Sequence, residues 1–315
     1  MRERFQVVGV YNSVHALAEN CARELDATPY ASFREMMEDP SLDAVMVLED
    51  DWYRLMPVLA ACDYGKAVFC GAEIDLTSAT ASEIQSRIRT AGVAFMTELS
   101  RRFAPATLRL KELIATRLGR PRLLFCHRRM VCDTKSARDV ECLESKSQRE
   151  LVELIDWCSY IVGDSPNWVQ GIRHLGPLAP NTSDYQIFSL GFGSPEQEPQ
   201  SILAQISCGA YIPSIWHEAI TYRPPAAIQV CCEKGVAFVD LPSTLVWFDD
   251  AGRHQEALDT ELSIGQQMFI QFHRAVTSLV CNSSDLDDAC RALDILEMAK
   301  KSMADQQRIP LQWTK

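Results

Sequence analysis

Short apolar runs alternate with amphipathic segments through the first third of the chain. The runs are typical of buried parallel strands, and the intervening segments place apolar residues three or four positions apart, as helices do. We expect strands at 5–11, 43–48, 67–70 and 93–96, and helices at 14–25, 33–37, 56–64 and 79–91. This alternation predicts a parallel sheet wrapped by helices.

The pattern changes after a helix expected over 105–118 and the turn Gly119-Arg120-Pro121. One further helix is expected over 148–162, and two more close the chain, but most of this half consists of successive strand-like runs. These runs lie at 122–127, 168–172, 185–190, 202–208, 227–232, 236–241 and 245–248. Strands with few helices between them predict a mostly antiparallel sheet. We therefore expect an α/β chain of two domains, residues 1–120 with the parallel sheet and residues 121–315 as an α+β domain, its last helix packing back on the first.

Composition and charge exclude several classes of protein. The chain has 315 residues and a formal net charge of −11, which argues against nucleic-acid binding because phosphates require clustered Lys and Arg. No stretch approaches the roughly 20 apolar residues of a membrane span, and the first residues lack a signal-peptide layout. Twelve cysteines without a C-x-x-C pair, and six histidines without ligand spacing, indicate free thiols and no metal site. We expect a cytoplasmic protein with no membrane contact.

Four stretches carry a resemblance to a known family. They are 27–47, Gly65 to Cys70, the run from Arg101-Arg102-Phe103-Ala104-Pro105 to Pro121, and Leu154-Ile155-Asp156-Trp157. Their order and spacing resemble the Gfo/Idh/MocA family of nicotinamide-dependent sugar and polyol oxidoreductases. The resemblance implies that residues 1–120 form a Rossmann-like, degenerate dinucleotide-binding domain, and that residues 121–315 form the family's C-terminal α+β domain.

The resemblance also implies that the cofactor site is not retained. A dinucleotide pyrophosphate needs a glycine-rich turn at a helix N-terminus, and the chain has no G-x-G-x-x-G. By the family's layout its sequence starts at the second Rossmann strand, without the first strand and glycine loop. The acid that binds the ribose is replaced by Asn12, and Asp50 and Asp51 place carboxylates where an anionic cofactor would lie. We expect no cofactor; a solvated acidic helix start is the plainer interpretation of the two aspartates.

The family's catalytic positions are occupied by other residues. Ala72 stands at the catalytic lysine, Arg149 at the aspartate and Glu153 at the histidine. Alanine cannot transfer a proton, and the i, i+4 spacing of Arg149 and Glu153 favours a surface ion pair. The remaining candidates for ligand contacts are Glu73, Arg101, Arg102 and His217. For the two arginines we favour a role in holding the two domains together, and for His217 that of a plain loop residue.

Whether the chain is an enzyme is left open by these replacements. We favour a non-catalytic pseudoenzyme that binds a small molecule or a partner. One alternative is an active NAD- or NADP-dependent oxidoreductase on a sugar or polyol, with a misassigned start. Another is a cofactor-independent enzyme that uses cleft carboxylates such as Glu73 and Glu153. The family resemblance implies a homo-oligomer, or a hetero-oligomer with an active relative, through the open face of the C-terminal sheet.

Overall fold

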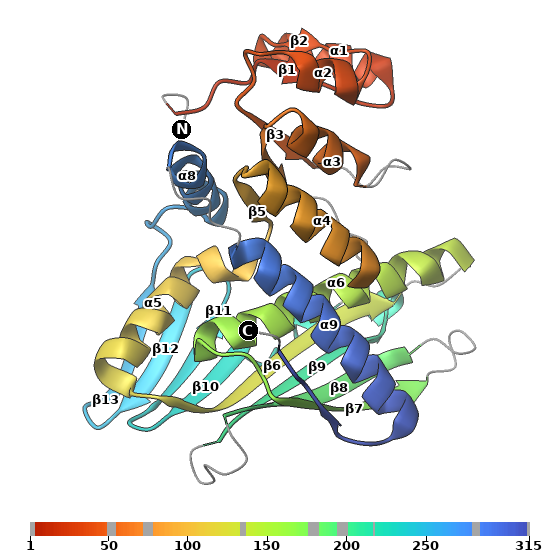
Figure 1. The fold of residues 1–315 in the computed structure, drawn as a ribbon. Coiled ribbons are helices and arrows are strands. Elements are labelled where there is room, and N and C mark those ends of the chain that lie inside the picture. The colour runs from red at the N-terminus through yellow and green to blue at the C-terminus, as the bar shows by residue number, and fades with distance from the viewer. Residues whose placement is uncertain are drawn as a thin grey trace. The chain divides into compact units, whose positions relative to one another are not determined.

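The computed structural model describes residues 4–48, 55–71, 78–132, 137–175, 183–193, 201–216, 218–278 and 284–313. The chain divides into two compact units (Figure 1). Unit 1 comprises Met1–Glu98 and Gly265–Cys290, and unit 2 comprises Leu99–Ile264 and Arg291–Lys315. The expected α/β architecture is confirmed: unit 1 contains parallel strands, and the sheet of unit 2, expected to be mostly antiparallel, has one parallel pair among antiparallel ones. The sequence placed the boundary near residue 120, whereas residues 99–118 count with unit 2 because Leu110, Leu113 and Leu118 join its core.

Unit 1 contains two separate parallel sheets. β1 (Gly9–Val10) pairs with β2 (Thr28–Pro29), and the second sheet has the order β3 (Ala44–Val47), β4 (Ala67–Cys70), β5 (Phe95–Thr97). The helices between the strands are α1 (His15–Leu25), α2 (Phe33–Glu38), α3 (Met56–Asp63) and α4 (Ser78–Ala91). The strand expected over 5–11 is confined to β1, which pairs with β2 along one edge; no other described strand pairs with it.

A late segment of the chain completes unit 1. Helix α8 (Ile264–Thr277) supplies Phe269 and Phe272, whose rings lie 5.7 and 5.6 Å from that of Phe69 on β4. The ring of Phe5 stacks on Phe272 at 6.4 Å and meets Phe269 edge-on at 5.8 Å. Helix α9 (Ser284–Asp305) begins in unit 1 and ends in unit 2. Aromatic contacts therefore join segments about 265 residues apart in the sequence.

Unit 2 is built on one nine-stranded sheet. Its order is β13-β12-β11-β10-β6-β9-β8-β7-β14. The central strands β6 (Pro121–Cys132) and β9 (Ile202–Pro213) pair in parallel, and their neighbours pair antiparallel. The other strands are β7 (Trp168–Leu175), β8 (Ser183–Phe192), β10 (Ile228–Cys232), β11 (Val236–Asp240), β12 (Thr244–Asp249), β13 (Gly252–Ala257) and β14 (Ile309–Pro310). The sequence missed β13 because GRHQEA is an edge strand without the apolar alternation of a half-buried one.

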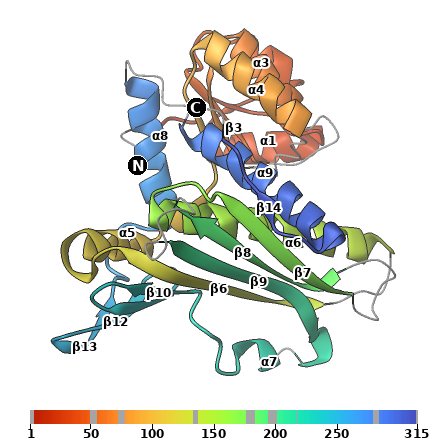
Figure 2. The same cartoon turned by 60° about the horizontal axis from the view of Figure 1, so that its bottom comes forward.

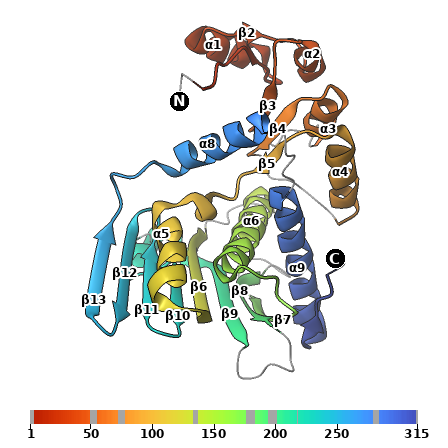
Figure 3. The same ribbon diagram turned by 60° about the vertical axis from the view of Figure 1, so that its left-hand side comes forward.

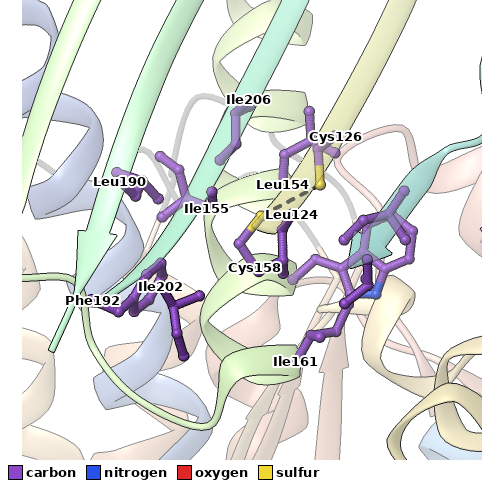
Figure 4. Close-up of a cluster of buried hydrophobic side chains, with 14 of the residues drawn as sticks. Leu124, Cys126, Leu154, Ile155, Cys158, Ile161, Leu190, Phe192, Ile202 and Ile206 are labelled. Atoms are coloured by element: carbon purple, nitrogen blue, oxygen red, sulfur yellow. Dashed lines mark hydrogen bonds between the residues drawn. The ribbon is translucent and has the colours of Figure 1, made fainter. Parts of the chain in front are cut away.

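Helices cover one face of this sheet, and the core lies beneath them (Figures 2 and 3). They are η1 (Ser100–Phe103), α5 (Pro105–Leu113), η2 (Ile114–Leu118), α6 (Ala137–Val162) and the later part of α9; η4 (Ser214–Trp216) and α7 (Glu218–Thr221) follow β9. Leu154, Ile155 and Cys158 of α6 pack on the inward side chains of β6 and β9 (Figure 4). The thiols of Cys158 and Cys126 are 3.4 Å apart, and the ten cysteines whose state is known are free. No helix in the described part of the chain is long and apolar enough to cross a membrane.

Candidate functional site

Five charged side chains gather where η1 lies beside α6 in unit 2. We call Arg101, Arg128, Arg149, Glu150 and Glu153 the α6 charge cluster. Pro105 at the start of α5 holds Ala104 extended, which ends η1 and fixes the arginines that precede it. Glu150 and Glu153 are three residues apart and share one side of α6, where their like charges repel. A cation between them would offset this repulsion.

Arg101 supplies that cation. Its Nη2 lies 2.6 Å from Glu150 Oε2, and its Nη1 donates to Glu153 Oε2. Glu153 also accepts from Ser100 Oγ at 3.3 Å and lies 3.8 Å from Arg149 Nε, while Arg128 lies 3.3 Å from Glu150. The i, i+4 contact predicted for Arg149 and Glu153 is thus present, with Arg149 at the exposed end of the cluster. Three guanidinium groups face two carboxylates, so the cluster carries one net positive charge.

The second arginine of η1 makes a separate buried pair. Arg102 donates from Nε to Asp156 Oδ2 at 2.7 Å and from Nη2 to Oδ1, in the bidentate geometry that suits guanidinium and carboxylate. The side chains are 9% and 3% exposed, and the guanidinium lies 5.2 Å from the ring centroid of Tyr160. The sequence favoured a role for Arg101 and Arg102 in holding the two domains together, whereas the carboxylates they pair with belong to α6 of the same unit, unit 2. These contacts satisfy the arginines without a ligand.

Burial dominates the acid–base properties of this cluster. It raises the pKa of Glu153 above the usual value, although Arg101 acts in the opposite direction. Burial also raises the pKa of Cys208, which lies near Glu150, to about 12, so this thiol is protonated at neutral pH. Burial therefore favours the protonated form of Glu153, while the arginines of the cluster stay protonated.

We expect the stability of Glu153→Gln to depend on pH in a defined direction. Because the folded-state pKa of Glu153 exceeds that of the unfolded chain, the stability from its protonation is present at low pH and is lost as pH rises through the folded pKa. The neutral variant should therefore gain stability relative to the unmodified protein as the pH rises from 4 to 7. Urea unfolding at both pH values measures this difference.

Glu256 provides a matched control of opposite sign. The hydrogen bond from Arg109 is the largest cause that lowers the pKa of Glu256, so its carboxylate stabilises the fold above the unfolded pKa and loses this effect on acidification. Glu256→Gln should accordingly lose stability relative to the unmodified protein between pH 4 and pH 7. The same sign for both variants would contradict the assignment for Glu153.

Of the other predicted site residues, the structure describes Asn12 only. Asn12 lies between β1 and α1, where its Oδ1 accepts from the backbone N–H of Val14 at 2.8 Å. Asp50, Asp51, Ala72, Glu73 and His217 lie outside the described residues. Sequence reasoning did not assign a role to Glu150 or Asp156. Asp156 had a usable signal, since a carboxylate on the apolar side of α6 requires a buried partner.

The strand-to-helix turns described in unit 1 do not fit a dinucleotide diphosphate. Residues 11–14, between β1 and α1, and residues 30–32, between β2 and α2, contain no glycine. Any side chain at such a turn blocks the approach of the pyrophosphate to the backbone. The carboxamide oxygen of Asn12 is already bonded to the turn that precedes α1.

The sequence matches a known family over its first third. Residues 1–99 match the GFO_IDH_MocA model, described as an oxidoreductase family with an NAD-binding Rossmann fold. An inositol 2-dehydrogenase/D-chiro-inositol 3-dehydrogenase of Shouchella clausii is 26% identical over 75% of this chain and 67% of its own length. An NADP(+)-dependent D-xylose 1-dehydrogenase of Haloferax volcanii is 34% identical, but over 29% of this chain and 28% of its own length.

A solved structure with a similar fold covers nearly the whole chain. It is a levoglucosan dehydrogenase in complex with NADH and levoglucosan, with a TM-score of 0.80 at 14% identity. The match covers 97% of this chain and 90% of that one. At this identity the likeness establishes the two-unit fold.

Proposed function

Because this chain belongs to the Gfo/Idh/MocA oxidoreductase family, we propose that it is a non-catalytic member that binds a small molecule or a partner. The observation that carries the proposal is the pairing of Arg101 with Glu150 and Glu153 on α6. The family resemblance puts the proton-transfer residues at positions 149 and 153 of this helix. Here a guanidinium that cannot exchange its proton stands at one, and an ion-paired carboxylate stands at the other.

The proposal includes the loss of cofactor binding. It is supported by the absence of glycine from the two described turns of unit 1 and by the bonded carboxamide of Asn12. Alanine at the position of the catalytic lysine, residue 72, supports it from the sequence. Hydride transfer needs a bound nicotinamide and a group that accepts the alcohol proton, and this chain would supply neither.

Calorimetric titration with NAD, NADH, NADP and NADPH tests this function. We expect no saturable heat up to about 1 mM ligand, which limits any binding free energy to about −4 kcal/mol. The levoglucosan dehydrogenase whose structure contains NADH serves as the positive control. Micromolar binding would contradict the proposal and would favour the alternative of an active dehydrogenase on a sugar or polyol.

The raised pKa of Glu153 favours one further candidate, an enzyme that works without a cofactor. A carboxylate with a raised pKa suits general acid–base catalysis. This candidate predicts turnover of sugars or polyols in the absence of nucleotide, and loss of that turnover in Glu153→Gln and Glu73→Gln. Equal rates in the unmodified and Glu153→Gln proteins would remove it.

We also propose that the chain associates with a second copy, or with an active relative, through the sheet face opposite α6. Outward side chains of β6, β8, β9 and β10 alternate with the core residues of the same strands, and among them Leu123, Phe125 and Leu203 are partly exposed. Of these outward positions, all in the described part of the chain, Arg129 alone carries a permanent charge. Because this face carries almost no charge, two copies can bring it together without placing like charges in contact, although each chain carries a net charge of −11.

A further inference from the structure

A histidine and a serine form a hydrogen-bonded pair at the centre of the sheet face opposite α6. His127 on β6 and Ser207 on β9 are neighbours in register, on the two central strands of unit 2 (Figure 2). Leu124 and Cys126 point into the core, so His127 points to the opposite face of the sheet. The distance from His127 Nδ1 to Ser207 Oγ is 2.5 Å. Ser207 is buried, whereas His127 is partly exposed.

The hydroxyl of Ser207 fixes which nitrogen of His127 titrates. Ser207 Oγ donates its one proton to the carbonyl oxygen of Cys126 at 3.4 Å, so it accepts from the Nδ1–H of His127. Neutral His127 therefore carries its proton on Nδ1 and a lone pair on Nε2. Within the described residues Nε2 has no hydrogen-bond partner, and it is not one of the buried atoms that lack a partner. Water therefore reaches Nε2 in a single copy, and the imidazole is protonated there.

The charges around His127 disfavour a second positive charge. Arg129 lies two positions along β6 on the same face, and burial and then the charge of Arg129 lower the pKa of His127. Helix α7 also contacts β6 and carries Glu218, which is exposed and forms no ion pair with His127 within the described residues. The outward side chains of β8, β9 and β10 are uncharged at neutral pH, and the titratable ones among them are Tyr185, Tyr211 and Cys231.

Association through this face would remove water from His127. A neutral imidazole can enter the interface with its Nδ1–H already bonded to Ser207, but an imidazolium would have to leave water beside the fixed charge of Arg129. The partly exposed apolar residues of the face, such as Phe125 and Leu203, offer no compensating carboxylate. The pKa of His127 is therefore lower in the associated form than in a single copy, and an imidazolium opposes association.

We propose that His127 makes the association of two copies through this face dependent on pH, because the dimer accommodates the neutral imidazole and excludes the protonated one. The inference rests on the association proposed above. Affinity is fully present above the pKa that His127 has in a single copy, and it is lost as the pH falls through that pKa. Each copy brings one imidazole, so dissociation takes up one proton per copy and the dissociation constant responds more steeply than to a single group.

The net charge of the protein predicts the opposite trend. Each chain carries a formal charge of −11 at pH 7, and acidification towards the isoelectric point of about 5.1 reduces the repulsion between copies. Without a specific group, association should therefore strengthen as the pH falls from 7.5 to 5.5. Weaker association over this range would instead indicate a group that the interface buries uncharged, as it would His127.

Sedimentation equilibrium of the full-length protein at pH 7.5 and pH 5.5 tests the inference. We expect the dissociation constant to be at least about fivefold larger at pH 5.5. His127→Gln keeps a neutral side chain with a donor for Ser207, so its dissociation constant should stay within about twofold across the same range. His15→Gln makes the same substitution at an exposed histidine of unit 1 and should keep the full response to pH.

The outcomes separate the role of His127 from the association itself. A protein that is monomeric at pH 7.5 and about 100 μM contradicts the association and, with it, this inference. A dimer whose dissociation constant is equal or smaller at pH 5.5 leaves the association standing and overturns the role of His127; this result needs no variant. A response to pH that persists in folded His127→Gln, or that coincides with loss of the circular dichroism signal of the unmodified protein, also overturns it.

Discussion

Replacing Asp156 by alanine is expected to lower the free energy of unfolding by about 3–5 kcal/mol. The carboxylate is 3% exposed and takes two hydrogen bonds from Arg102, which is itself 9% exposed. Its removal takes the bidentate carboxylate away from a guanidinium buried in unit 2, and breaking a buried pair costs more than losing one exposed ion pair. Chemical denaturation followed by circular dichroism gives this free energy.

Two variants test whether burial is the cause. Glu256→Ala removes an equally bidentate arginine pair whose side chains are about 30% exposed, so it should cost no more than about 1 kcal/mol. The double variant Arg102→Met, Asp156→Leu removes both charges together and should recover part of the loss. Equal destabilisation by Asp156→Ala and Glu256→Ala would show that the buried pair has no special weight.

Phe125→Glu is expected to weaken association of the proposed dimer by about 100-fold or more. Phe125 lies on β6, the middle strand of the nine, and its side chain points to the face opposite α6 while remaining 38% exposed. A carboxylate there would be buried against an apolar surface in the dimer, and changes at the centre of an interface cost about 2–4 kcal/mol. Sedimentation equilibrium over a range of protein concentrations measures the dissociation constant.

Leu262→Glu is the matched control for this effect. It places the same charge at another partly exposed apolar residue of unit 2, outside the sheet strands. We expect it to leave the dissociation constant within about threefold of the unmodified protein. A monomeric unmodified protein at about 100 μM, or equal effects of the two variants, would contradict association through this face.

Local patterns in the sequence predicted most of the helices and strands, but not which neighbouring segments bury their apolar sides. The spacing of Val14, Leu17, Cys21 and Leu25 predicted a helix, and α1 is present. The structure buries Ala18 and Ala22 of this helix and leaves Leu17 and Leu25 exposed. Periodicity reports which side of a helix is apolar, and the neighbours that bury it are set by distant parts of the chain.

In the α6 charge cluster too, the sequence predicted a contact within one helix but not a contact between two elements. The i, i+4 spacing predicted the contact between Arg149 and Glu153, since both residues lie on one helix. The pairing of Arg101 with Glu150, 49 positions later in the sequence, depends on how η1 packs beside α6. The sequence around Arg101 or Glu150 does not predict this contact, because each residue by itself is typical of a charged surface position.

The return of α8 to unit 1 has a consequence for how the protein is made on the ribosome. Phe5 and Phe69 leave the exit tunnel early, but the rings they pack against, Phe269 and Phe272, are synthesised only after the whole nine-stranded sheet except β14. Domains generally fold as their residues emerge. Unit 2 can therefore assemble most of its core while unit 1 still waits for its last helix, and the first unit in the sequence is among the last to be completed.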